Sequence, residues 1–230
     1  RTLWGWLWLI KRQNIKIHDV VFKAVGNFYF RSNTEVFPDN YFTLSEQEKF
    51  EVLENVSGDL DPNVFDNVIT RQTLESIQAV KTIQVNNGEF GANRYIISNN
   101  ESALNVLETF ALIKLSNWEE ATIDIIPLFE SVDDLQHAHE IMEKLYTNAS
   151  YAAHLKRRGN KQTIMLGFSD GTKDGGYLMA NWSIYKAKEA LTEISRKYDV
   201  QAIFFVGRGG PPARGGGKTH KFYASLGPNI

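Results

Sequence analysis

The chain has 230 residues, 43% of them hydrophobic and 23% charged, with a formal net charge of -2 at pH 7. This length can bury a substantial core in one large domain or two small ones. The charge indicates neither a nucleic-acid nor a membrane partner. The absence of cysteine excludes disulfide bonds and thiolate chemistry and is consistent with a cytoplasmic protein.

The first 93 residues are predicted to be mostly helical. The opening "RTLWGWLWLI" (1–10) is apolar but too short to span a bilayer, so it is interpreted as a buried strand. Thr43 and Glu46 occupy capping-box positions at the start of a predicted helix. A later helix is expected to stop near Asn86-Asn87-Gly88.

Residues 94–230 alternate between apolar strands and amphipathic helices. A parallel sheet with helices on its faces is the fold that this alternation favours. Trp182 and Tyr185 fall at core spacing on the last long helix and are predicted to pack inside, whereas Asp133 and Asp134 are predicted to cap an earlier one. The predicted strands, about five with the opening run, cover residues 94–98, 122–130, 162–170 and 200–206.

Polar residues follow these strands where each one ends. Glu130 comes after the second, Asp170 and Lys173 after the third, and Arg208 and Arg214 after the fourth. Parallel strands bring their C-terminal ends to one face, where such folds build active sites. Two acids and several bases there favour a divalent cation beside a phosphorylated or carboxylated ligand. Ordinary polar surface loops are the alternative.

The segment "VGRGGPPARGGGKTH" (206–220) holds six of the chain's 17 glycines. Bare glycine backbone can approach a ligand closely, and arginine pairs with phosphate or carboxylate, so the loop is interpreted as an anion cradle. It is not a P-loop, because Pro212 stands where that motif requires its first glycine.

"GFSDG" (167–171) matches the nucleophile motif G-x-S-x-G of serine hydrolases. Such an enzyme needs an acid and then a histidine downstream, and only His220 follows Ser169. A serine hydrolase is therefore kept as a lesser alternative. His137 and His139 are two residues apart on a predicted helix and do not have the spacing of a metal pair.

Three long motifs in register resemble the phosphoenolpyruvate carboxylase family: "PLFESVDDL", "MLGFSDGTKDGGYLMANWSIYKAKEAL" and "GRGGPPARGGGKTH". The likeness runs from about Arg12 to the end and includes "GANRYIIS". Because members of that family are several times longer, the resemblance implies an internal fragment of the catalytic region. The expected fold is α/β, a partial (β/α)8 TIM-type barrel with additional helices, 1–93 mostly helical and 94–230 made of β/α units.

The resemblance also implies a reaction. A carboxy-lyase of this family forms oxaloacetate and phosphate from phosphoenolpyruvate and bicarbonate, through carboxyphosphate and an enolate, with Mg²⁺ or Mn²⁺. The full-length enzyme is expected to be a cytoplasmic homo-oligomer, a tetramer. In this reading Glu130 and Asp170 are similar to the metal ligands, and Lys173 to the active-site lysine.

The substrate-binding residues implied by the resemblance lie near the two ends of the chain. Arg208 and Arg214, with Gly209 and Gly210, are similar to the mobile glycine loop that binds bicarbonate and the transferred phosphate. Arg12 is similar to an arginine that contacts the substrate phosphate.

The chain departs from the family pattern in two places. Val206 stands where the family usually has histidine or aspartate, and the essential histidine of the family's Thr-Ala-His-Pro stretch is absent from these 230 residues. The isolated chain is therefore expected to be inactive. The alternative is a degenerate or truncated domain that binds anions without turnover.

Overall fold

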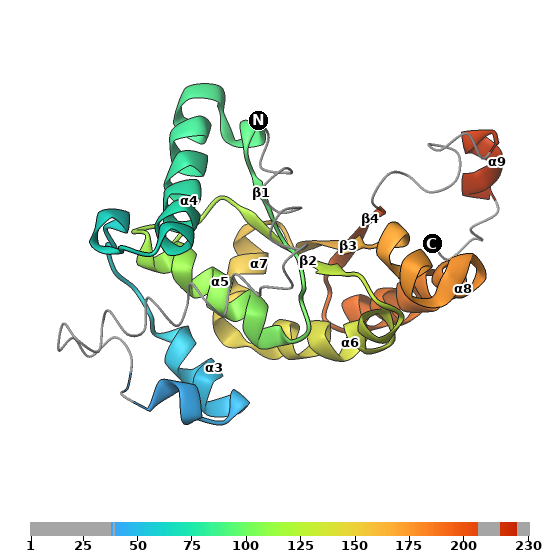
Figure 1. Ribbon diagram of the computed structural model, residues 1–230, viewed down its shortest axis with the longest axis horizontal. Coiled ribbons are helices and arrows are strands. Elements are labelled where there is room, and N and C mark those ends of the chain that lie inside the picture. The colour runs from blue at the N-terminus through green and yellow to red at the C-terminus, as the bar shows by residue number, and fades with distance from the viewer. Residues whose placement is uncertain (1–37, 39, 207–216, 225–230) are drawn as a thin grey trace. The chain divides into compact units, whose positions relative to one another are not determined.

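The computed structural model describes residues 38, 40–206 and 217–224 (Figure 1). The chain divides into two compact units, 1–95 with 104–125 and 96–103 with 126–230. Several sequence-based predictions lie outside the described residues: the opening strand at 1–10, Arg12, Arg208, Gly209, Gly210 and Arg214.

The described elements follow in chain order. They are η1 (Tyr41–Thr43), α3 (Glu46–Glu54), η2 (Pro62–Val64), α4 (Val68–Asn87), η3 (Glu89–Gly91), β1 (Arg94–Ile97), α5 (Ala103–Leu115), β2 (Asp124–Phe129), α6 (Val132–Thr147), α7 (Ala149–Arg157), β3 (Lys161–Leu166), α8 (Phe168–Lys197), β4 (Gln201–Val206) and α9 (Thr219–Ala224).

The four described strands form one sheet in the order β1-β2-β3-β4. The backbone N–H of Asp124, which begins β2, donates to the carbonyl of Asn93, just before β1 (2.8 Å). In the same way the N–H of Gln201 at the start of β4 donates to the carbonyl of Asn160, just before β3 (2.7 Å). Neighbouring strands therefore start at the same edge, and the parallel α/β arrangement predicted from the sequence is confirmed.

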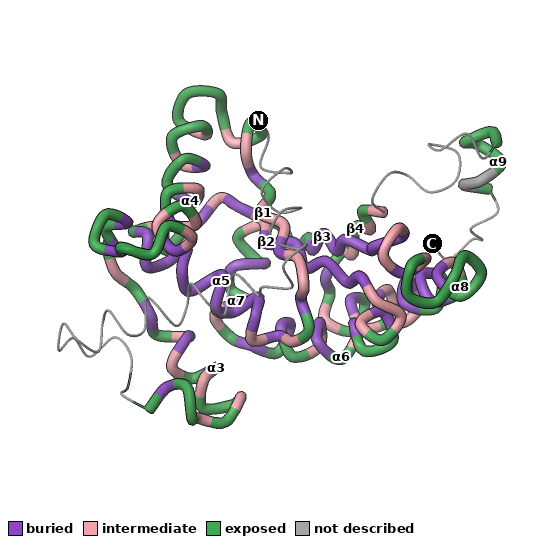
Figure 2. Tube along the Cα trace, viewed as in Figure 1, coloured by how far each residue is buried: buried purple, intermediate pink, exposed green. Residues whose placement is uncertain are grey.

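The two faces of the sheet differ at β4. Leu128, Met165 and Phe205 are register partners and share one face, on which the first two are buried but Phe205 is 41% exposed. Figure 2 shows β2 and β3 as mainly buried and β4 as partly exposed. The opposite face carries Phe204 and is covered by α8, whose Lys188 places Nζ 5.9 Å from the Phe204 ring centroid. Burial lowers the pKa of Lys188. One face is thus closed, and the other is open at its β4 end.

Helix α8 begins earlier than the sequence predicted. The third strand was expected to reach Asp170, but β3 ends at Leu166, and Phe168 already lies in the helix. Gly176 interrupts α8 with φ 80° and ψ 169°, so a short segment before it is separated from the long one after it. Glycine tolerates this positive φ without the strain that a Cβ would add. Asp170 therefore lies on the first turn of a helix rather than at a strand end.

Helix α8 packs along α6 through polar contacts near their C-terminal halves. The hydroxyl of Tyr146 lies 3.0 Å from that of Ser195, and both are buried. The Nζ of Lys197 donates to Glu143 at 2.6 Å. These contacts hold the long segment of α8 in place.

The prediction that Trp182 and Tyr185 lie in the core was wrong. Trp182 is 59% exposed and Tyr185 37%, and their rings stack with centroids 5.9 Å apart on the outer side of α8. The helix instead buries Ala180, Ile184 and Leu191. Periodicity identified an apolar stripe, but the neighbouring stripe, with Ala180, Ile184 and Leu191, is the one that faces the core.

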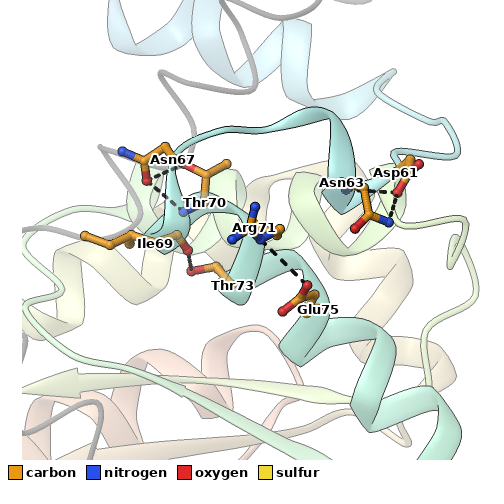
Figure 3. A network of polar contacts seen from close by, with 8 residues as sticks. All are labelled: Asp61, Asn63, Asn67, Ile69, Thr70, Arg71, Thr73 and Glu75. Atoms are coloured by element: carbon orange, nitrogen blue, oxygen red, sulfur yellow. Dashed lines mark hydrogen bonds and ion pairs between the residues drawn. The ribbon is translucent and has the colours of Figure 1, made fainter.

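In the first unit, capping residues define where α4 begins. The side chain of Asn67 accepts a hydrogen bond from the N–H of Thr70 at 3.0 Å, as Figure 3 shows. Helix α4 ends at Asn87, and Gly88 follows with φ 80°, as the sequence predicted. The predicted capping box at Thr43 and Glu46 was wrong by two residues.

The observed capping box consists of Ser45 and Glu48 at the start of α3. The predicted and the observed position both have the Ser/Thr-x-x-Glu spacing that a capping box requires, because Thr43-x-x-Glu46 and Ser45-x-x-Glu48 overlap.

Within the described residues, no helix combines the length and apolarity that a membrane crossing requires.

Two buried asparagines provide a test of this packing. Asn148 caps α7, because its Oδ1 accepts the N–H of Tyr151 at 3.0 Å. Asn100, three residues after β1, is 0% exposed, and in the described part of the chain neither its Nδ2 nor its Oδ1 has a hydrogen-bond partner. An unmet buried amide costs about 1–3 kcal/mol, whereas a cap contributes about 1 kcal/mol.

We therefore expect opposite effects from the same substitution. Asn148→Ala should lower the free energy of unfolding by about 1 kcal/mol, because a cap is lost. Asn100→Ala should leave it unchanged or raise it by up to about 1 kcal/mol, because an unmet polar group is removed. Urea unfolding followed by circular dichroism measures both. An Asn100→Ala loss as large as that of Asn148→Ala would show that the Asn100 amide is paired in solution.

Candidate active site

Glu130 follows β2 directly and precedes helix α6. The residue is only 9% exposed. Its backbone N–H donates to Oδ2 of Asp134 at 3.2 Å, and the N–H of Ser131 donates to the same oxygen at 2.9 Å. The main chain that carries the Glu130 carboxylate is thus fixed by the first turn of α6.

Asp170 and Lys173 lie one turn apart on the short first segment of α8. The Lys173 Nζ lies 3.4 Å from Oδ1 of Asp170, with the lysine side chain 78% exposed and that of the aspartate 30% exposed. An ion pair this exposed contributes little to stability. Lys173 is therefore available at the surface, while Asp170 is partly sheltered.

The structure brings the backbones carrying Glu130 and Asp170 side by side. The N–H of Gly167, three residues before Asp170, donates to the carbonyl of Phe129 at 2.8 Å. A Cβ added to Gly167 would lie 3.0 Å from Cα of Glu130, and one added to Gly171 would lie 3.5 Å from the Glu130 carbonyl oxygen. The start of α8 therefore rests on the end of β2, at the C-terminal edge of the sheet.

This donor set fits a hard divalent cation. Carboxylate oxygens are its preferred protein ligands, and Mg²⁺ is commonly held by one or two carboxylates while waters and substrate phosphates complete the shell. Among the described residues there is no group of three or more histidine, cysteine, aspartate or glutamate side chains able to hold a metal alone. Glu130 and Asp170 could thus supply two oxygen ligands of a cation, and other groups would have to complete its shell.

Ser169 does not have the backbone of a hydrolase nucleophile. In that class the serine sits on a strained strand-to-helix turn. Here Ser169 is within α8, and the non-helical geometry inside this helix is at Gly176. The described non-glycine residues with positive φ are Asn99, Asn117, Asn160 and Asp199. The geometry therefore argues against the serine-hydrolase alternative.

Two aspartates at the site have structural roles, and only one was predicted. Asp134 completes a capping box with Ser131, whose hydroxyl accepts the Asp134 N–H at 3.0 Å, so the predicted cap is confirmed. Asp174 on α8 accepts the N–H of Val132 at 2.9 Å and was not singled out from the sequence. The Ser-x-x-Asp spacing reveals a local cap, but no local pattern reveals a partner 42 residues away.

At the end of β4, Val206 is half-buried and leads into residues outside the described part of the chain. It pairs in register with Leu166 of β3, so its side chain lies on the sheet face that α8 covers. An apolar side chain suits that position.

The sequence comparisons bear on the same region. The model of the family described as phosphoenolpyruvate carboxylase matches residues 11–227. The chain belongs to the phosphoenolpyruvate carboxylase family. The resemblance seen in the three motifs is therefore confirmed, and the matched range includes every candidate site residue.

The chain is also similar over most of its length to a curated phosphoenolpyruvate carboxylase. The chain is 35% identical over 218 residues to the phosphoenolpyruvate carboxylase of Nitrosomonas eutropha (strain DSM 101675 / C91 / Nm57). The alignment covers 91% of this chain but 23% of that protein. The chain thus spans about a quarter of the length of the curated relative that it matches.

The contact between β2 and α8 can be tested at its two glycines. Gly167→Ala should lower the free energy of unfolding by about 1–3 kcal/mol, because its Cβ would lie 3.0 Å from Cα of Glu130 and 3.2 Å from the Phe129 carbonyl oxygen, and backbone atoms must shift to relieve these contacts. Gly171→Ala is the matched control, since its Cβ would meet its neighbours at an ordinary 3.5 Å. Urea unfolding measures the stability of both variants. Equal stability of the two would mean that Gly167 does not lie as close to the Glu130 backbone as 3.0 Å requires.

Proposed function

We propose that this chain forms part of the active site of a phosphoenolpyruvate carboxylase and that the complete enzyme is a longer protein. In this proposal the enzyme converts phosphoenolpyruvate and bicarbonate into oxaloacetate and inorganic phosphate. The observation that carries it is the family match over 11–227, together with Glu130 and Asp170 on adjoining segments at one sheet edge. Active sites of parallel α/β proteins form at that edge.

Glu130 and Asp170 are the proposed ligands of Mg²⁺ or Mn²⁺. Such a cation, when bound, stabilises negative charge on phosphate and enolate oxygens. The residues of the chain hold it in position: Asp134 fixes the backbone of Glu130, and the packing of Gly167 on β2 sets the start of α8. These two contacts support the proposal that Asp170 and Glu130 bind one cation.

Cationic side chains are the proposed partners of the reacting anions. An oxygen of bicarbonate attacks phosphorus, the bond from phosphorus to the enol oxygen breaks, and carboxyphosphate and an enolate result. Carboxyphosphate then releases CO₂ and phosphate, and the enolate carbon attacks CO₂ to give oxaloacetate. Arg12, Arg208 and Arg214 are assigned to the phosphate and bicarbonate, and the exposed Lys173 to the same anions.

The sheet supports a larger enclosure around this site. Parallel sheets are normally covered on both faces, yet Ile203 and Phe205 of β4 are each 41% exposed. In the proposed enzyme further strands continue the sheet past β4 into a (β/α)8 barrel, with the Leu128–Met165–Phe205 face on its inside. The four described strands alternating with helices are compatible with that closure.

A non-catalytic, anion-binding homologue is the second candidate. Val206, an apolar residue directly before the glycine-rich segment, is the observation that favours it, because the polar side chain expected there from the family resemblance is missing. Turnover by the full protein distinguishes the two candidates.

The first test measures oxaloacetate formation by the full protein, coupled to malate dehydrogenase and NADH. We expect Mg²⁺-dependent activity, and we expect Glu130→Gln and Asp170→Asn each to lower kcat by roughly 10²-fold or more, the scale of losing one electrostatic contact in the transition state. Asp133→Asn is the control, because Asp133 is 85% exposed on the first turn of α6. Wild-type protein without turnover would support the anion-binding candidate instead.

The second test concerns the planar fork of an arginine. In the full protein, Arg214→Lys keeps the charge but loses bidentate pairing, so kcat should fall roughly 10²-fold. The same assay measures it, with Lys218→Arg as the control for a neighbouring cation. Near-normal turnover of Arg214→Lys would contradict the assignment of Arg214 to the reacting phosphate.

A further inference from the structure

We infer that Asp174 is a positioning residue that locks the turn bearing Glu130 onto the helical segment bearing Asp170 and Lys173. This inference rests on the proposed function, since it concerns how the two proposed metal ligands are held together. The carrying observation is one hydrogen bond: the N–H of Val132 donates to Oδ2 of Asp174 at 2.9 Å across 42 residues of sequence.

Three successive backbone N–H groups at the turn are held by two carboxylates. Asp134 accepts those of Glu130 and Ser131, and Asp174 accepts that of Val132. The N–H of Val132 belongs to the first turn of α6, where helix geometry leaves N–H groups without intrahelical partners, and those of Glu130 and Ser131 lie just before the helix. Asp134 ties the turn to its own helix, whereas Asp174 ties it to α8.

Close packing brings Asp174 within reach. A Cβ added to the next residue, Gly175, would lie 2.9 Å from Cγ2 of Val132 and 2.9 Å from Cγ of Met179. The segment from Phe168 to Gly175 therefore lies directly on the start of α6, and the break at Gly176 separates it from the long part of α8. The Asp174 hydrogen bond is thus a polar contact that fastens this short segment to the turn, beside the close packing at Gly167 and Gly175.

The consequence concerns the relative placement of two ligands. Asp170 is one helical turn before Asp174, and Glu130 is two residues before Val132. The Asp174–Val132 hydrogen bond thus connects the two segments that carry the proposed ligands, within a few residues of each ligand. Loss of the bond should loosen their spacing and weaken metal binding, although Asp174 itself binds no metal in this proposal.

The experiment measures Mn²⁺ affinity of the full protein by the electron paramagnetic resonance signal of free Mn²⁺. Asp174→Ala should weaken binding about tenfold, the scale seen when residues that orient metal ligands are changed. Asp174→Asn should recover most of the affinity, because its amide oxygen can accept the same N–H. Asp133→Ala is the control, since it removes a carboxylate from the same helix start without removing a hydrogen bond to the backbone of this turn.

A second variant removes the donor instead of the acceptor. Val132→Pro deletes the N–H that donates to Asp174. Proline is well tolerated at the first position of a helix, which Val132 occupies. The preceding Ser131, with φ -86° and ψ 166°, has the extended backbone that a residue before proline requires. It should weaken Mn²⁺ binding as much as Asp174→Ala, and the double variant should be no weaker than either. Urea unfolding of each variant checks folding separately.

The outcomes separate this inference from the function on which it rests. Mn²⁺ binding that is lost in Asp170→Asn but unchanged in Asp174→Ala and Val132→Pro would overturn the inference and keep the metal site. Lower unfolding midpoints with unchanged Mn²⁺ affinity would reduce Asp174 to a structural cap. Wild-type protein with no Mn²⁺ affinity, or with affinity that Asp170→Asn leaves intact, would overturn the proposed metal site and this inference with it.

Discussion

The site depends on the contact between the end of β2 and the residue after β3. The N–H of Gly167 donates to the carbonyl of Phe129, and the absence of a side chain at Gly167 lets Glu130 approach. This contact fixes where α8 starts, and therefore where Asp170 and Lys173 project. The Cβ of a larger residue at Gly167 would press on the backbone of Phe129 and Glu130, and no side-chain rotation relieves such a contact. Because of this contact, a glycine with no chemistry of its own determines the geometry of a candidate metal site.

Four acids near this contact divide into two roles. Asp134 and Asp174 direct their carboxylates at backbone N–H groups, where the positive end of the α6 dipole favours them. Glu130 and Asp170 are the pair assigned to an external cation. The sequence predicted the cap at Asp134 from its position at a helix start, and the family resemblance implied the role of Glu130 and Asp170. The sequence did not separate Asp174 from the other acids, because the helix start that Asp174 meets is 42 residues away.

The sequence predicted the strand order along the chain and the parallel sheet, because β/α alternation and short aliphatic runs are local signals. It misplaced the end of β3, because the apolar Phe168 continues the strand pattern although it is already a buried residue of α8. It placed Trp182 in the core because periodicity identifies a stripe without saying what covers it. Asp174 could not be found in this way, because its role depends on Val132, which is distant in sequence.

Large aromatic side chains lie exposed on the second unit. Trp182 on α8 and Phe205 on β4 each expose much of an aromatic side chain, and burying such groups is among the larger favourable terms in folding. The relative from Nitrosomonas eutropha is about four times the length aligned here, so a longer protein has ample chain to cover both. In the proposed enzyme the sheet face at Phe205 is interior, and the sheet edge carrying Glu130 and Asp170 is the rim of an enclosed site. Under that proposal water is excluded there, and the attraction between guanidinium groups and phosphate strengthens as the local dielectric falls.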